Sequence, residues 1–216
     1  DVTEQLLYEM QKAGADLIEI GIPFSDPVAE GPVIQEADDR ALSAGVTTDK
    51  IFDMVDDIAD KIHVPIVFMT YINPIYVYGV EKFAKRAKAC GAAGVIVPDV
   101  PFEEKEEIRG SFEAEGLVVI SMVAPTSADR VRMIAKEAKG FLYCVSSLGV
   151  TGVRTEIGTA IGDLIQTVKE ECSIPCAIGF GISTPEQAEA MAKISDGAIV
   201  GSAIVKIVAK YGKDCV

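Results

Sequence analysis

The sequence predicts one α/β domain of parallel strands, running from residue 1 to residue 216. Short apolar, β-branched runs recur between longer segments that have helical periodicity. These runs are continuously hydrophobic, as expected for parallel strands covered on both faces. No charge-rich linker or low-complexity stretch divides the chain, whose length suits a single core. The predicted strands are 17–22, 65–71, 94–99, 118–123, 141–146, 176–181 and 197–202.

Helical patterns fill the intervals between the predicted strands, and their ends carry capping residues. Side-chain oxygens that can accept a free N–H group of a first helical turn stand at Thr47-Thr48, at Ser127, and at Ser183 or Thr184. Gly14 and Gly91 stand where a left-handed residue closes a helix. The predicted helices are 3–13, 34–43, 49–61, 80–89, 103–114, 128–136, 158–171, 185–193 and 203–210.

The positions of the polar residues favour a (β/α)₈ TIM barrel over an open doubly wound sheet. Seven strands are predicted where a closed barrel needs eight, and the pattern opens with a helix. We therefore expect the first strand, and with it the last helix, to lie outside these 216 residues. Polar residues or glycines mark the carboxyl ends of most strands, which form the rim where barrel enzymes place their sites. They are Glu19, Tyr71, Asp99, Tyr143, Gly181 and Ser202.

Composition excludes several classes of function. The net charge is −13 with no Lys/Arg run, which disfavours binding to nucleic acid or to an anionic membrane surface. No apolar run approaches the roughly 20 residues that span a bilayer. The five cysteines form no CxxC pair and His63 is the single histidine, so no metal site is expected. Reduced thiols of this kind are typical of a cytoplasmic protein.

Glycine-rich turns near the C-terminus predict a phosphate site. Gly179-Phe180-Gly181 and Gly201-Ser202 end two consecutive strands before helices, where barrels bind phosphate on backbone N–H groups. A third turn, ending at Gly152, could close over the anion. The alternative is that these glycines only serve tight turns.

Two carboxylates predict acid–base chemistry. Glu19 interrupts an apolar strand, and burial of a carboxylate there raises its pKa and suits it to proton transfer. Glu30 follows after a proline-stiffened loop and could hold a second carboxylate across the pocket. The alternative is that Glu30 and Asp26 are solvated loop acids, with Asp26 capping a turn.

The sequence resembles a known family, the α subunit of tryptophan synthase. The resemblance rests on EIGIPFSDPVAEGPVIQ, FMTYINPIYVYG, VIVPDVPFEE, FLYCVSSLGVTGVR, AIGFGISTPEQ and GAIVGSAIVK, which are collinear and cover nearly the whole chain. It implies a TIM-barrel lyase that cleaves indole-3-glycerol phosphate to indole and glyceraldehyde 3-phosphate in tryptophan biosynthesis. It further implies an α₂β₂ heterotetramer, with no cofactor in this chain and pyridoxal phosphate in the β subunit.

The resemblance also implies roles for individual residues. Glu19 matches the glutamate that protonates indole C3, and Tyr143 matches a tyrosine lining the pocket beside it. Glu30 stands where the family usually has an aspartate that faces the indole N–H, so its longer side chain puts the placement of the ring in question. The phosphate-binding positions are Gly152, Gly181, Gly201 and Ser202, with Phe180 beside them.

Further positions are expected to line the site or to face the partner. The resemblance implies that Thr151 lies in a loop that closes the site and that Asp26 lies in a loop that contacts the Thr151 loop. It also implies that Asp99 and Pro101 lie on a loop that faces the β subunit. The expected pocket side chains, for each of which barrel packing is the alternative, are Phe24, Ile34, Met69, Tyr71 and Val123.

Two other functions stay open from the sequence. One is a different phosphate-binding barrel, such as a sugar-phosphate isomerase or epimerase, although a metal-dependent epimerase would need inward histidines. The other is a subunit that binds the substrate and activates its partner without turnover of its own.

Overall fold

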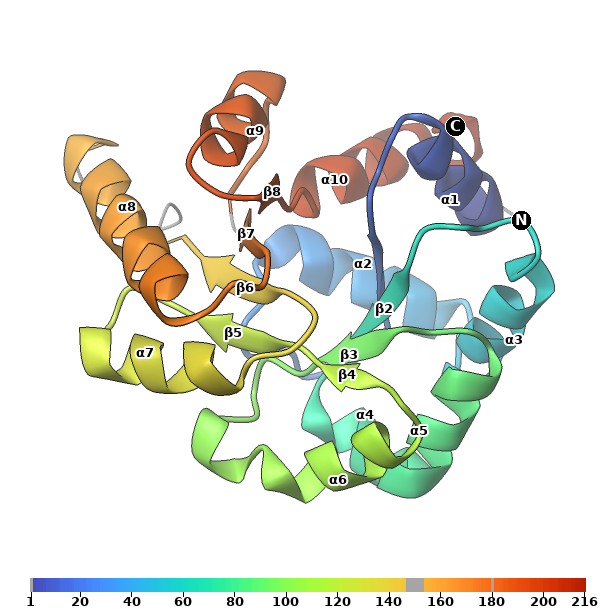
Figure 1. Cartoon of the computed structure of the whole chain (residues 1–216). Coiled ribbons are helices and arrows are strands. Elements are labelled where there is room, and N and C mark those ends of the chain that lie inside the picture. Colours follow the sequence, from blue (N-terminus) through green and yellow to red (C-terminus); the bar gives the residue numbers. More distant parts are fainter. Residues whose placement is uncertain (1, 147–153, 180) are drawn as a thin grey trace. The chain divides into compact units, whose positions relative to one another are not determined.

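The computed structural model describes residues 2–146, 154–179 and 181–216, and the chain divides into two compact units (Figure 1). Unit 1 comprises the chain up to Val119 together with Ile207–Val216. Unit 2 is Ile120–Lys206. Each unit contains one four-stranded sheet in which all strand pairs are parallel and follow the order of the chain.

Strands β1 (Ile18–Gly21), β2 (Ile66–Met69), β3 (Gly94–Ile96) and β4 (Val118–Val119) form the sheet of unit 1. Gly94 of β3 lies opposite Val118 of β4, and a Cβ atom at Gly94 would stand 3.2 Å from the Val118 carbonyl carbon. Glycine is therefore required here for the two backbones to approach. The helices around this sheet are α1 (Val2–Lys12), α2 (Pro32–Ser43), α3 (Thr48–Ile58), α4 (Ile72–Tyr78), α5 (Val80–Ala89), the short 3₁₀ helix η1 (Phe102–Glu104) and α6 (Glu106–Ala114).

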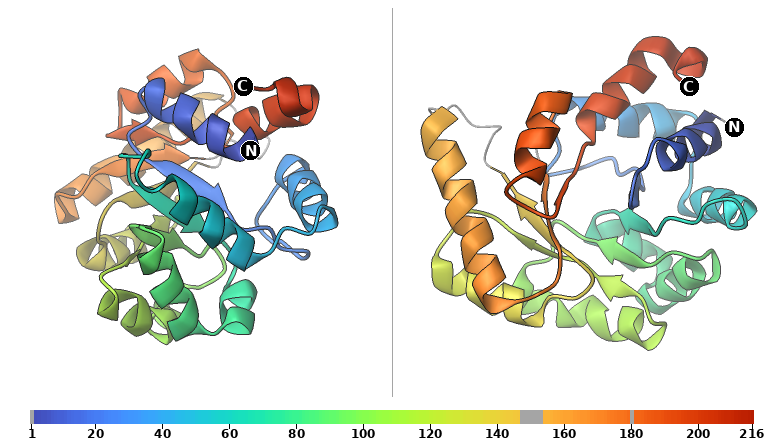
Figure 2. Two further views of the ribbon diagram at one scale, coloured as in Figure 1. Left: turned by 90° about the vertical axis from the view of Figure 1, so that its right-hand side faces the viewer. Right: turned by 45° about the horizontal axis from the view of Figure 1, so that its top comes forward.

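An aromatic cluster stabilises the core of unit 1. The ring of Phe52 on α3 lies 5.2 Å from Phe68 on β2 and 5.1 Å from Phe83 on α5, both nearly edge to face. Phe83 in turn lies 5.9 Å from Phe112 on α6. All four rings are fully buried, so they join three helices to the sheet. The side-by-side packing of α5 and α6 is visible in both views of Figure 2.

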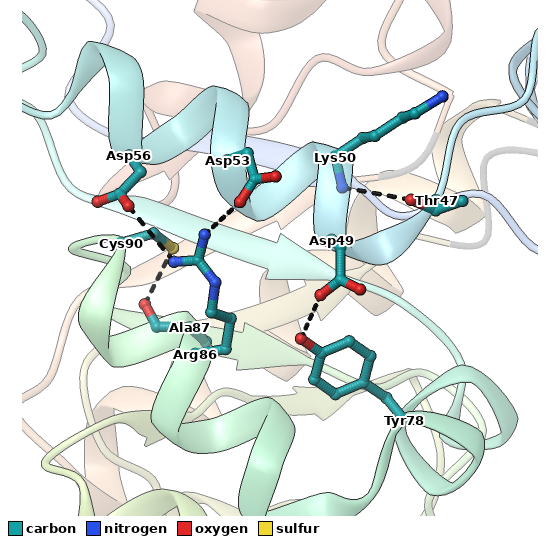
Figure 3. A network of polar contacts seen from close by, with 9 residues as sticks. All are labelled: Thr47, Asp49, Lys50, Asp53, Asp56, Tyr78, Arg86, Ala87 and Cys90. Carbon is teal, nitrogen blue, oxygen red and sulfur yellow. Dashed lines mark hydrogen bonds and ion pairs between the residues drawn. The ribbon is translucent and has the colours of Figure 1, made fainter.

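A polar network lies on the rim of this cluster, between α3 and α5 (Figure 3). The guanidinium of Arg86 on α5 forms ion pairs with Asp53 and, at 3.5 Å, with Asp56, both on α3. Tyr78, at the end of α4, donates a hydrogen bond of 2.5 Å from its hydroxyl to Asp49. Burial and this hydrogen bond raise the pKa of Tyr78 to about 12.

Strands β5 (Ser121–Val123), β6 (Leu142–Val145), β7 (Cys176–Gly179) and β8 (Gly197–Ala198) form the sheet of unit 2. Its helices are α7 (Ala128–Glu137), α8 (Arg154–Glu171) and α9 (Pro185–Ala192), and α7 packs on α8. Helix α10 (Ser202–Tyr211) begins in unit 2 and continues into the last segment of unit 1, where the 3₁₀ helix η2 (Gly212–Asp214) follows.

The predicted helix caps are confirmed. The hydroxyl oxygens of Thr47, Ser127 and Thr184 accept hydrogen bonds from the third residue after each of them, over 3.3, 3.4 and 3.3 Å. Gly14 and Gly91 have the left-handed φ angles of 97° and 88° that were expected of them. Local sequence therefore fixes where these helices begin and end.

The structure differs from the predicted elements in several places. The predicted strands 94–99 and 197–202 end at Ile96 and Ala198, and the predicted helix 103–114 is divided into η1 and α6. The run 118–123 is not one strand. It is interrupted at Ile120, and the two parts, β4 and β5, belong to different sheets. The sequence also missed α4, whose first residue, Ile72, donates its N–H to the Asp99 carboxylate at 3.0 Å. This cap comes from a residue 27 positions away, so local patterns could not reveal it.

No helix in the described part of the chain is long and apolar enough to cross a membrane.

Candidate active site

Glu19 is the first group of the site, in the middle of β1 of unit 1. Its neighbours Ile18 and Ile20 are buried, and it pairs in register with Val67 of β2. The Glu19 side chain is half-buried, and its Oε1 has no hydrogen-bond partner among the described residues. Desolvation raises its pKa to about 7. Near neutral pH, Glu19 is thus populated both as a proton donor and as a proton acceptor.

The segment 22–31 leads from β1 to α2 and carries the second carboxylate, Glu30. The Ala29 N–H donates to the buried hydroxyl of Tyr71 at 2.8 Å, and the Phe24 ring lies 5.6 Å from the Tyr71 ring. From α2, the Gln35 side-chain amide donates to the carbonyl of Glu30 at 2.8 Å. The loop around Glu30 is therefore attached on both sides, to α2 and to the start of α4.

Glu30 is half-buried, and its Oε2 is shielded from solvent without a hydrogen-bond partner in the described ranges. Its pKa is raised, chiefly by desolvation and further by the charges of Asp38 and Asp99, against backbone N–H groups that lower it. Desolvation also raises the pKa of Asp38 on α2 to about 6, although the backbone N–H of Phe24 acts to lower it. The Glu30 carboxylate thus interacts electrostatically with two others, those of Asp38 and Asp99.

The other predicted residues of unit 1 fall into different environments. Met69 at the end of β2 and Ile34 on α2 are half-buried, and Tyr71 is buried directly before α4. Asp26 is exposed and accepts a 2.5 Å hydrogen bond from the Ser25 hydroxyl, as a solvated loop acid does. Pro101 is exposed and precedes η1.

In unit 2, Tyr143 is buried in the middle of β6, opposite Ala177 of β7. A Cβ atom at Gly179 would lie 2.6 Å from the Tyr143 ring, so the ring packs directly on the glycine backbone. Sequence reasoning assigned Gly179 only to a turn, whereas its packing role depends on a neighbouring strand. Val123 is buried at the end of β5, the strand next to β6.

The described phosphate-binding candidates are open to solvent. Gly181 follows β7 with a φ of +78°, and Gly201 and Ser202 open α10. All three are exposed, and a Cβ atom at Gly201 would meet no described atom within 4 Å. Packing within the described structure therefore does not require glycine at 201. The other two phosphate-binding candidates, Gly152 and Phe180, lie outside the described residues, as does Thr151 of the expected closing loop.

Sequence reasoning missed Asp38. Two adjacent acids on a helix, Asp38 and Asp39, are typical of a solvated face, and nothing in the local pattern distinguishes one from the other. Only the folded structure distinguishes them, because Asp38 is half-buried and Asp39 is exposed. Among the described residues, no group of three or more His, Cys, Asp or Glu side chains could hold a metal ion.

Comparison with known proteins gives consistent results. Residues 1–215 match the family described as tryptophan synthase alpha chain. The tryptophan synthase alpha chain of Lacticaseibacillus casei is 48% identical over 210 residues, which cover 97% of this chain and 79% of that protein.

Solved structures are similar over almost the whole length. Tryptophan synthase subunit alpha from Campylobacter jejuni is 34% identical with a TM-score of 0.91, covering 99% of this chain and 86% of that one. A chain of the tryptophan synthase complex from Pyrococcus furiosus is 36% identical with a TM-score of 0.89, again covering 99% and 86%.

Proposed function

This chain belongs to the tryptophan synthase alpha chain family, and on that premise we propose that Glu19 and Glu30 are the two carboxylates of its active site. The chain has the (β/α)₈ TIM-barrel fold of its structural neighbours. It is a carbon–carbon lyase that cleaves indole-3-glycerol phosphate to indole and glyceraldehyde 3-phosphate in tryptophan biosynthesis. The α chain has no cofactor of its own, and pyridoxal phosphate belongs to the β subunit.

The half-buried Glu19 is the observation that carries the proposal. Cleavage requires a proton on indole C3 and the removal of a proton from the hydroxyl next to the breaking bond. Glu19 in its acid form donates the first proton. The electron pair of the breaking bond then returns to the ring, the hydroxyl carbon becomes the aldehyde, and the Glu19 carboxylate accepts the hydroxyl proton. Its pKa of about 7 suits both steps.

Glu30 is proposed to stabilise the positive charge that develops on the indole ring. Its unpartnered Oε2 leaves a carboxylate oxygen free to accept a hydrogen bond from the indole N–H. Tyr71 and Gln35 hold the backbone on either side of it, and such restraint favours a fixed ring position. The proposed apolar contacts to the ring in unit 1 are Phe24, Ile34 and Met69.

For the phosphate group of the substrate we propose backbone and hydroxyl donors of unit 2. Gly201 and Ser202 open α10, where free N–H groups and the helix dipole favour an anion. Gly181 adds an exposed left-handed turn after β7. Gly152 and Phe180 are proposed to complete this set, and Thr151 to lie in the loop that closes the site. Tyr143 and Val123 are proposed to line the pocket, and Asp26 the loop beside it.

The chain forms a complex with the β subunit, and we propose that residues near α4 face it. Asp99 caps α4, and Pro101 is exposed just after it. On α4 itself, Tyr76 and Val77 are exposed, Val77 to 82%. Apolar side chains that gather on one exposed surface favour a protein partner. A cytoplasmic location is part of the same proposal, supported by the five free thiols, all of which lie in described segments.

The experiment is indole release from indole-3-glycerol phosphate by the Glu19→Gln variant. We expect turnover to be abolished while substrate binding, measured by calorimetry, persists, because the change removes the proton but little volume. Glu36→Gln, on the exposed face of α2, is the matched control. Retained turnover in Glu19→Gln would refute the assignment of Glu19.

Glu30→Asp tests the second carboxylate. The charge is kept and the side chain loses one methylene, so we expect this variant to be active. An inactive but folded Glu30→Asp would mean that the pocket is built for the longer side chain.

An assay of the wild-type chain distinguishes a lyase from a subunit that binds the substrate without cleaving it. Substrate binding without any indole release, with or without the β subunit, would favour a non-catalytic binding subunit instead.

A further inference from the structure

We infer that Gly21 is a specificity-determining residue, because the side chain that a glycine lacks leaves room for the indole ring of the substrate beside Glu19. The inference rests on the proposed function of Glu19 and extends it to a residue that contributes space rather than a functional group. Gly21 is the last residue of β1, two positions after Glu19.

The first observation is that Glu19 and Gly21 lie on the same face of β1. Successive side chains of a strand point to opposite faces, so positions 19 and 21 share one face. The residues of the opposite face, Ile18, Ile20 and Ile22, are buried in the hydrophobic core that this sheet forms with its helices. The face of Glu19 and Gly21 is therefore turned away from that core.

The second observation is that the fold does not require glycine at position 21. A glycine inside a strand costs stability, and it marks a bulge, a left-handed turn, or the close approach of another backbone or of a ligand. Strand β1 has no bulge here, because Gly21 pairs in register with Met69 and the Ile22 N–H continues the ladder to the Met69 carbonyl at 2.9 Å. Its φ angle is not left-handed, and a Cβ atom built on it would meet no described atom within 4 Å.

Gly94 of the same sheet shows the contrast, since a Cβ atom there would collide with the backbone of Val118. For Gly21, the remaining reason is the approach of a ligand.

The third observation is what surrounds the open position. The Oε1 atom of Glu19 is buried and has no hydrogen-bond partner among the described residues. Gly21 is exposed, and its cross-strand neighbour Met69 is half-buried. The proposed partner of indole C3, Glu19, comes before Gly21, and the proposed partner of the indole N–H, Glu30, lies in the loop after it. We place the ring that joins these two atoms over Gly21, where a side chain would occupy part of its volume.

The test replaces Gly21 by alanine and by valine in the full chain and measures the binding of two probes by calorimetry. One probe is 3-(indol-3-yl)propyl phosphate, which lacks the hydroxyl next to the breaking bond and so cannot be cleaved. The other is propyl phosphate, which lacks the ring. Gly110→Ala, at an exposed position of α6, is the matched control, because a Cβ atom there also has open space. The midpoint of urea unfolding reports the stability of each variant.

We expect the dissociation constant of the indole probe to rise about threefold in Gly21→Ala and about tenfold or more in Gly21→Val, since added methyl groups take volume from the ring. The affinity for propyl phosphate should stay within about twofold of the wild type, and Gly110→Ala should change neither affinity. The urea midpoint should be unchanged or higher in both Gly21 variants, because alanine and valine order the unfolded chain more than glycine does.

Other outcomes would overturn the inference. Equal affinity of Gly21→Val and Gly110→Ala for the indole probe would mean that the ring lies elsewhere. A lower urea midpoint in Gly21→Ala, or an equal loss of affinity for both probes, would mean that this glycine serves the fold.

The proposed function fails separately, if Glu19→Gln retains turnover. Weaker binding of the indole probe alone in Gly21→Val, together with retained turnover in Glu19→Gln, would support the position of the ring but contradict the catalytic role of Glu19. The failure of the two proposals can thus be told apart.

Discussion

At the scale of the residue, the position of Glu19 in an apolar strand raises the pKa of its carboxyl group. The apolar strand around it excludes water, and its neutral form is stabilised relative to the carboxylate. The same desolvation that suits it to acid–base work also opposes folding when the group is charged. Glu19 should therefore contribute to the pH dependence of the chain's stability.

The expected pH dependence follows from the sign of the pKa shift. The pKa of Glu19 is near 4.5 when unfolded and about 7 when folded, so its stabilising contribution is complete below pH 4.5 and is lost as pH rises to 7. The full loss corresponds to about 3 kcal/mol. In Glu19→Gln, the free energy of unfolding, measured in urea at pH 5 and pH 8.5, should decrease less over this range than in the wild type. An identical decrease in both proteins, with Glu36→Gln as control, would contradict the buried position of Glu19.

At the scale of the element, α3 and α5 are joined by two kinds of contact. In the core, the rings of Phe52 and Phe83 pack edge to face. At the surface, Arg86 forms ion pairs with two aspartates of α3. The Arg86 guanidinium also lies 5.8 Å from the centroid of the Phe52 ring. Because both aspartates are more than half exposed, most of the helix–helix stability should come from the rings.

This division can be measured with a double-mutant cycle. Arg86→Met combined with Asp53→Asn should give a coupling energy of about 0.5–1 kcal/mol at low ionic strength, and less at about 1 M salt. The Lys193–Glu189 ion pair at the end of α9, in which both side chains are exposed, serves as the reference for a solvent-exposed pair. A coupling that does not change with salt would mean that the Arg86 pair is shielded from water.

At the scale of the whole molecule, the excess of acidic residues and the exposed apolar side chains of α4 have different consequences. The net charge of −13 opposes association with other acidic surfaces. Tyr76, whose hydroxyl binds Glu107 of α6, and Val77 nevertheless present apolar area to solvent. A stable complex with the β subunit would bury this area.

We therefore expect indole release from indole-3-glycerol phosphate to increase when the β subunit is added. Val77→Glu places a charge in the proposed contact and should weaken binding to the β subunit about tenfold or more, as measured by calorimetry. Ile207→Glu, on the exposed side of α10, introduces the same charge elsewhere. Equal affinities for the β subunit in both variants would place the contact away from α4.

Local patterns along the chain were enough to predict the class of fold and the chemical types of the site. Continuous apolar runs identify buried parallel strands, and Thr47, Ser127 and Thr184 cap helices through bonds to residues three positions away. Glu19 could be recognised because a carboxylate in an apolar strand conflicts with its surroundings. These signals are local, so they can be read without knowing what lies beside them.

Tertiary structure alone decided the features that depend on distant partners. Helix α4 begins where Asp99 accepts the Ile72 N–H, Gly179 is needed because the Tyr143 ring packs on it, and β4 separates from β5 because each pairs with a different strand. Asp38 is half-buried whereas the adjacent Asp39 is exposed. Burial and hydrogen bonding are properties of the neighbours that folding supplies, so no local pattern could have revealed them.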